Sequence, residues 1–92
     1  MIKIPKFKVK YIGHIAVATG KFEEDFQEPI NTVRELISWL DKKYFGFKDI
    51  FIDNSGNQKL DTMIYLTRRN EPTKIITDLD IKIEDDDIIT FW

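Results

Sequence analysis

The sequence predicts an α+β fold in which one helix packs across a mixed sheet of four to five strands. Three observations predict it. A strictly alternating segment lies near the start of the chain, an amphipathic helical segment with a clear beginning lies in the middle, and several extended segments follow it. Strands on both sides of a single helix are typical of an α+β roll, in which all strands join one sheet.

Residues 6–11 are predicted to form a half-buried strand, because lysines and apolar residues alternate along them. The apolar face of this strand carries Phe7, Val9 and Tyr11. A loop is expected at residues 13–20, which begin and end with glycine. Residues 21–27 resume an extended pattern with Phe22 and Phe26 on one face, so the two segments predict a hairpin with a long connection.

The central helix is the most clearly marked element. Thr32-Val33-Arg34-Glu35 has the form of a capping box, in which the Thr hydroxyl accepts from a backbone amide and the Glu reaches back. A stripe of apolar residues at helical spacing then faces the core: Val33, Leu36, Ile37, Leu40 and Tyr44. Gly46 is expected to end the helix in a left-handed conformation.

The second half of the chain predicts further strands separated by turns. The predicted elements are a short extended run at 50–52, a turn at 53–57, a third strand at 60–68, a short edge strand followed by an irregular turn within 73–83, a turn at 85–87 and a last strand at 88–92. Asp, Asn, Ser and Gly make residues 53–57 a strong turn signal.

The composition excludes several kinds of site. The chain has no Cys, which excludes disulfides, thiolate zinc sites and thiol nucleophiles. The acidic residues 84–87 lack the spacing of a calcium loop, so a solvated turn is predicted there and no metal or cofactor is expected. His14 is predicted to be a loop residue, and it forms no recognisable hydrolase triad with Ser38 or Ser55. We therefore expect no catalytic residues and no enzyme activity.

Length and charge indicate one domain, residues 1–92, with a net charge of −2. The bases Lys3, Lys6, Lys8 and Lys10 precede every acid, whereas acids predominate in residues 78–92. These opposite charges would favour pairing of the two chain ends, and their balance argues against nucleic acid as a partner. No apolar run suits a membrane span or a signal peptide, so a cytoplasmic protein without a membrane partner is expected.

Short motifs along nearly the whole chain resemble the MoaD/ThiS sulfur carriers of the ubiquitin-like β-grasp superfamily, and MoaD in particular. Residues 9–13 (VKYIG) resemble the family's first strand, residues 18–20 (ATG) the end of its first loop, and residues 32–36 (TVREL) its helix start. Residues 83–91 (IEDDDIITF) resemble its late segment Leu-x-Asp-Gly-Asp-x-Val-x-Phe. The resemblance implies a β-grasp fold and protein partners, namely an E1-like activating enzyme or a large synthase subunit.

The sequence departs from the family pattern at two points. Asp86 stands where the family has Gly, which is tolerable because Asp enters left-handed conformations more readily than most residues. The family also continues through prolines to a terminal Gly-Gly, which is adenylated and converted to a thiocarboxylate, whereas this sequence stops at Trp92. Two interpretations stay open: a shortened form of a sulfur carrier, or a non-covalent β-grasp interaction module.

Alternation and resemblance together predict a protein-binding surface on the open face of the sheet. Its predicted residues are Lys8, Lys10, Ile12, Ile88, Thr90 and Trp92. An exposed apolar patch rimmed by lysines has the composition of a protein interface. The alternative is that a loop or a second copy of the chain covers it. Arg68 and Arg69 are adjacent on a predicted strand and should point to opposite faces, so they are not expected to form one anion clamp.

Overall fold

The computed structural model describes residues 4–92, so Lys3 lies outside the described residues. In chain order the elements are β1 (Lys6–Tyr11), α1 (His14–Thr19), β2 (Glu23–Gln27), α2 (Val33–Lys43), α3 (Phe47–Phe51), β3 (Ile64–Thr67), β4 (Lys74–Ile75) and β5 (Ile88–Phe91). The strands form one sheet in the order β2-β1-β5-β3-β4. β1 and β5 are parallel, and the other neighbouring strands are antiparallel. The predicted α+β class and mixed sheet are confirmed.

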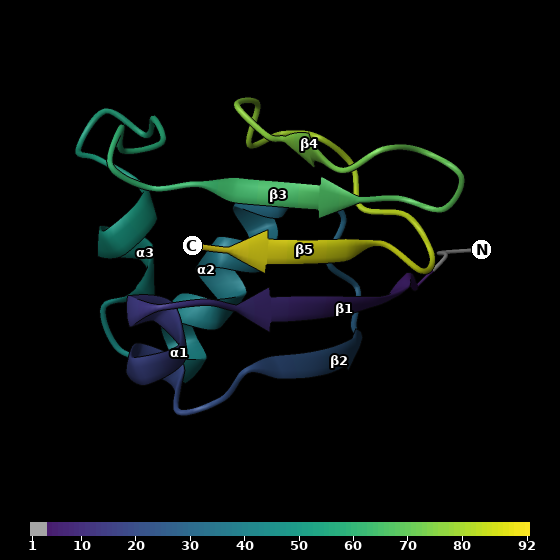
Figure 1. Cartoon of the computed structure of the whole chain (residues 1–92). Helices are drawn as coiled ribbons and strands as arrows, with labels where there is room; N and C mark the ends of the chain where they lie inside the picture. The colour runs from purple at the N-terminus through teal and green to yellow at the C-terminus, as the bar shows by residue number, and fades with distance from the viewer. Residues whose placement is uncertain (1–3) are drawn as a thin grey trace.

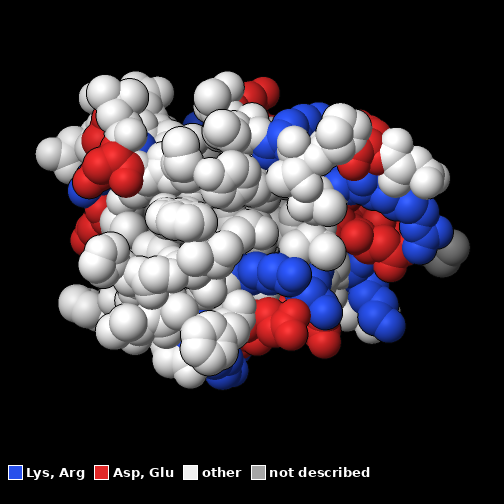
Figure 2. Space-filling model, viewed as in Figure 1, with Lys and Arg blue, Asp and Glu red and all other residues white. Residues whose placement is uncertain are grey.

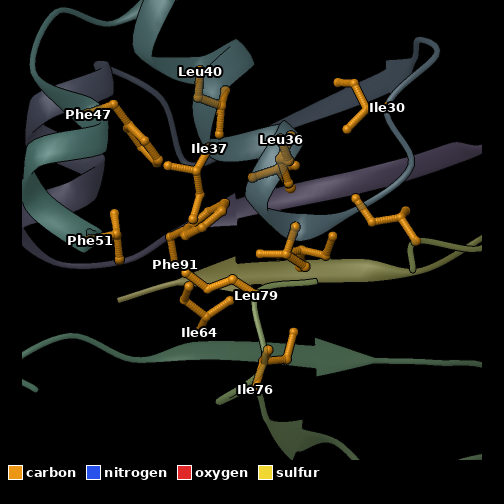
Figure 3. Close-up of a cluster of buried hydrophobic side chains, with 14 of the residues drawn as sticks. Ile30, Leu36, Ile37, Leu40, Phe47, Phe51, Ile64, Ile76, Leu79 and Phe91 are labelled. Carbon is orange, nitrogen blue, oxygen red and sulfur yellow. The ribbon is translucent and has the colours of Figure 1, made fainter. Parts of the chain in front are cut away.

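Helix α2 covers one face of the sheet and leaves the other open (Figure 1). The buried side of α2 consists of Val33, Leu36, Ile37 and Leu40, four residues of the predicted stripe. They meet inward-pointing side chains of the strands, and Figure 3 shows Leu36 and Ile37 above Phe91 and Ile64. Among residues 4–92, no helix has the length and apolar character needed to cross a membrane.

The start of α2 follows the capping prediction with one difference. The Thr32 hydroxyl accepts from the Glu35 amide at 3.2 Å, as in a capping box. The Glu35 carboxylate, however, accepts from the amide of Asn31 at 2.7 Å, one residue before the cap. The end of α2 also differs: Tyr44 is its C-cap, and Gly46 adopts its left-handed conformation (φ 81°) as the N-cap of α3.

Two short helices replace segments predicted to be a loop and a strand. Residues 14–19 form α1 because Ile15 and Thr19, one turn apart, are both buried, and the Thr19 hydroxyl donates to the Ile15 carbonyl at 3.0 Å. Residues 47–51 form α3 because a helix places Phe47 and Phe51 on the same buried side. The prediction of a loop at 13–20 was wrong. The predicted extended run at 50–52 was wrong for Ile50 and Phe51, whereas Ile52 is extended and forms an isolated bridge with Gln58.

The strand predictions hold with narrower bounds. The third strand covers Ile64–Thr67 rather than residues 60–68, and the edge strand covers only Lys74–Ile75. Phe26 is buried against Phe7, with ring centroids 5.4 Å apart, but Phe22 precedes β2 and is 82% exposed, so the two do not share a buried face. Asp86 has φ 67°, the left-handed conformation expected of the position where the related family has Gly.

Candidate functional site: the open face of the sheet

The register of the sheet brings all six predicted binding residues together on the open face. In the parallel pair of β1 and β5, Lys8 lies opposite Ile88 and Lys10 opposite Thr90. The same alternation carries Ile12 and Trp92 to this face just beyond the two strands, and the Ile12 amide donates to the Phe91 carbonyl at 3.0 Å. Their placement is as predicted, and their role in binding stays a prediction.

The apolar part of this face is larger than the sequence analysis predicted. Trp92 exchanges two backbone hydrogen bonds with Met63, at 2.9 and 3.1 Å, and Tyr65 lies between Thr90 and Ile75 across β5, β3 and β4. We call the exposed or half-buried residues at this end of the face the apolar patch: Ile12, Met63, Tyr65, Ile75 and Trp92. Trp92 is 56% exposed and Met63 43%. Such a cluster of large apolar side chains is typical of a protein-binding surface.

Charged side chains occupy the other end of the face. The ammonium of Lys8 lies 3.3 Å from the Glu23 carboxylate, whereas Lys10 makes no ion pair within the described chain. Figure 2 shows this division: most of the visible Lys, Arg, Asp and Glu gather on the right, and a broad uncharged surface covers the centre and left centre, near the C-terminus of Figure 1, with a few charged side chains at the left edge. The open face therefore offers an apolar contact area bordered by charge, which suits specific docking.

A groove of about 510 Å³ adjoins the apolar patch where the chain leaves β5. It is lined by Gly13, His14, Ile15, Ile50, Lys59, Asp61, Thr62 and Trp92. His14 is thus the first residue of α1 beside this groove, and not a loop residue as predicted. A partner that contacts Trp92 would also meet the groove.

The acidic turn before β5 is a structural anchor. Asp87 is completely buried, and its carboxylate accepts from the Arg68 guanidinium at 2.9 and 3.0 Å and from the Glu84 amide at 2.8 Å. Hydrogen bonding to Asp87 raises the pKa of Arg68 above its ordinary value. Arg69 pairs instead with Asp86 at 2.8 Å. The prediction of a solvated turn was wrong for Asp87. The two arginines bind different carboxylates and form no common anion clamp, as predicted.

A second buried carboxylate joins β2 to the rest of the molecule on the helix side. Glu24 has an 8% exposed side chain and accepts from the Lys43 and Lys21 ammonium groups and the Tyr11 hydroxyl. Burial acts to raise the pKa of Glu24, but these hydrogen bonds outweigh it and lower the pKa to about 2. Burial and the neighbouring Glu24 in turn raise the pKa of Tyr11. Within residues 4–92 no group of three or more His, Cys, Asp or Glu side chains is placed to hold a metal ion.

Several solved structures are similar to this chain along almost its whole length. A putative molybdopterin converting factor subunit 1 from Pyrococcus furiosus is 25% identical with a TM-score of 0.69, and the match covers 95% of this chain and 94% of that one. Small archaeal modifier protein 1 (SAMP1) from Methanosarcina acetivorans is 18% identical with a TM-score of 0.68, covering 96% and 91%. The HVO 2177 protein of Haloferax volcanii is 13% identical with a TM-score of 0.77, covering 97% and 82%.

No protein-family model and no curated protein matches the chain. The class of protein is nevertheless defined by the sheet order, the single covering helix and these similar structures: the chain has the ubiquitin-like β-grasp fold. The resemblance to the MoaD/ThiS family is confirmed by two of these structures, the MoaD-like molybdopterin converting factor subunit 1 and SAMP1.

Proposed function

We propose that this chain is a MoaD-like, ubiquitin-like protein that acts by docking the open face of its sheet onto another protein. The observation that supports docking is the exposed apolar patch, where Ile12, Met63 and Trp92 lie at the ends of the neighbouring strands β1, β3 and β5. Burying such side chains against a partner contributes roughly 25 cal/mol for each Å² of apolar surface removed from water.

The proposed partners are those of a sulfur carrier in molybdopterin biosynthesis, an E1-like activating enzyme or a large synthase subunit. The similarity to a putative molybdopterin converting factor subunit supports this assignment. The proposal gives the chain no catalytic step of its own and places it in the cytoplasm. Turnover of a substrate by the purified chain alone would contradict it. The alternative is a non-covalent β-grasp interaction module that uses the same face without sulfur chemistry.

Substitution of Trp92 tests docking directly. Trp92→Ala should weaken binding to the E1-like enzyme or the large synthase subunit of the same organism by at least about tenfold, because a central aromatic side chain commonly dominates an interface. Its thermal stability should be nearly unchanged, since the side chain is 56% exposed. Phe45→Ala is the matched control, because Phe45 is fully exposed but lies between α2 and α3, outside the open face. Equal affinity of the two variants, measured by calorimetry, would contradict docking through the apolar patch.

The intact mass of the protein purified from its own organism separates the carrier from the interaction module. A tail beyond Trp92 that contains proline and ends in Gly-Gly would support the carrier, and replacement of one oxygen by sulfur on that tail would identify the thiocarboxylate. A mass that ends at Trp92 would favour the interaction module.

A further inference from the structure

Strand β2 has a free edge that no other element of the described chain covers. It pairs only with β1, and Figure 1 shows it as the outermost strand on its side of the sheet. The Tyr11 amide donates to the Phe22 carbonyl at 2.8 Å, which fixes the alternation of this antiparallel pair. The backbone groups of Glu24 and Phe26 therefore face β1, and those of Glu23, Asp25 and Gln27 point away from the sheet.

The opposite edge of the sheet offers much less backbone. Strand β4 consists of Lys74 and Ile75 alone, and very short edge strands are a common protection against further pairing. Along β2, in contrast, alternate residues present an N–H and a C=O in one row. An added strand would find a regular ladder there.

The side chains of this edge are acidic. Residues 23–28 contain Glu23, Glu24, Asp25 and Glu28 and no basic residue. Lys8 pairs with Glu23, and two lysines pair with Glu24, but Asp25 is exposed and makes no ion pair within residues 4–92. Such an edge repels a second acidic strand, including a second copy of itself, and favours a basic one.

The helix side of the same edge offers an apolar contact. Phe26 is buried, and the ring of Trp39 meets it edge-on with centroids 5.1 Å apart. Beside Trp39 lies a groove of about 410 Å³, whose lining includes Pro29 and Ile30, two and three residues after the end of β2. Alternate side chains of an added strand would point toward this groove, while the others would lie beside Glu23 and Asp25.

We infer that the free edge of β2 binds an extended, lysine- or arginine-rich segment of another protein as a sixth strand. Its basic side chains lie on the open face beside Glu23 and Asp25, and the intervening apolar side chains lie on the helix side near Trp39. Backbone hydrogen bonds supply affinity and the alternation of side chains supplies specificity, as in other cases of strand addition. Most of the apolar patch is remote from this edge, because Met63, Tyr65 and Ile75 lie at β3 and β4, and β1 and β5 lie between these strands and β2.

The test uses a synthetic peptide of about seven residues in which Lys and Val alternate, a length typical of a strand. Its control has proline in place of each Val and therefore carries the same charge but cannot form a ladder. Binding of the first peptide should shift the amide resonances of residues 23–27 and slow hydrogen exchange at Glu23, Asp25 and Gln27. The control peptide should bind at least about tenfold more weakly.

Variants of Asp25 separate backbone pairing from charge. Asp25→Pro removes an outward N–H, which an edge strand tolerates, and should reduce peptide affinity at least about tenfold. Asp25→Lys keeps the backbone but reverses the charge and should also lose affinity, which keeps the test valid if the proline variant does not fold. Trp92→Ala should bind the peptide as the unchanged protein does, so the outcome is independent of docking through the apolar patch. Equal binding of both peptides, absence of binding, or concentration-dependent dimerisation through β2 would overturn the inference.

Discussion

Two carboxylates, Glu24 and Asp87, show how a buried acid is stabilised in this small domain. Each carboxylate pairs with a cation from another part of the fold. Lys43 of α2 pairs with Glu24 of β2, and Arg68, which follows β3, pairs with Asp87, which precedes β5. An isolated buried charge would be costly, and paired charges with several hydrogen bonds are tolerated. At the level of residues, these two anchors hold the acidic edge strand and the acidic turn in place.

Glu24 should make stability depend on pH in acid. Its pKa is about 2 in the folded protein against an ordinary 4.5, so its contribution is complete above pH 4.5 and is lost as the pH falls toward 2. The pKa difference corresponds to about 3 kcal/mol. Denaturant unfolding at several pH values should show a loss of about that size in the unchanged protein and a smaller one in Glu24→Gln. Glu23→Gln is the control, because the Glu23 side chain is 54% exposed, and it should keep the full pH dependence. Identical pH profiles for the unchanged protein and Glu24→Gln would contradict the assignment.

Part of the candidate site could be predicted residue by residue, and part could not. Alternation placed Lys8, Lys10 and Ile12 on the open face, because a regular strand requires it. The sequence analysis did not place Met63 and Tyr65 on the open face. Their alternation with the buried Ile64 and Leu66, within the predicted strand 60–68, would have indicated it. Ile75 carried no comparable signal, since a strand of two residues has no periodicity and joins the face only through its pairing with Tyr65.

At the scale of elements, the sequence predicts long elements better than short ones. The long helix α2 has a cap and a stripe of apolar residues over several turns, so local pattern was sufficient to predict it. The short helices α1 and α3 span six and five residues, which is too few to show a helical period, and the glycines beside them indicate loops. The i, i+4 spacing of Phe47 and Phe51 was the available sign of α3, but its meaning depends on the tertiary packing that buries both rings.

The turn that leads into β5 should be sensitive to loss of Asp87. Asp87→Ala leaves the Arg68 guanidinium, with an 18% exposed side chain, without its buried partner, and should lower the free energy of unfolding by about 3 kcal/mol. Asp86→Gly is the neighbouring control: it removes an exposed ion pair but suits the positive φ, so a change below about 1 kcal/mol is expected. Chemical denaturation of both variants makes the comparison. Equal losses would mean that the Arg68–Asp87 pair does not anchor the turn.

At the scale of the whole molecule, one aromatic cluster connects the sheet to α3. Phe51 packs against Phe47 and Phe91, with ring centroids 5.2 and 5.0 Å away, and Tyr11 stacks on Phe91 at 6.4 Å. Residues distant in the sequence thus share one core, as Figure 3 shows for Phe47, Phe51 and Phe91. The strand order β2-β1-β5-β3-β4 that brings them together depends on these long-range contacts, which is why local pattern does not reveal it.

Loss of one ring from this cluster should therefore destabilise the entire fold rather than α3 alone. Phe51 is completely buried, and Phe51→Ala should lower the free energy of unfolding by about 3 to 5 kcal/mol through lost burial and the cavity left behind. The loss should be the same by circular dichroism and by tryptophan fluorescence, because a single core unfolds cooperatively. Phe45→Ala is the control, because the Phe45 ring is fully exposed, and it should change the free energy of unfolding by less than about 0.5 kcal/mol. The contrary result would be a loss of helical circular dichroism in Phe51→Ala with an unchanged unfolding transition by tryptophan fluorescence. In that case α3 would unfold independently of the sheet, and the aromatic cluster would not couple the two.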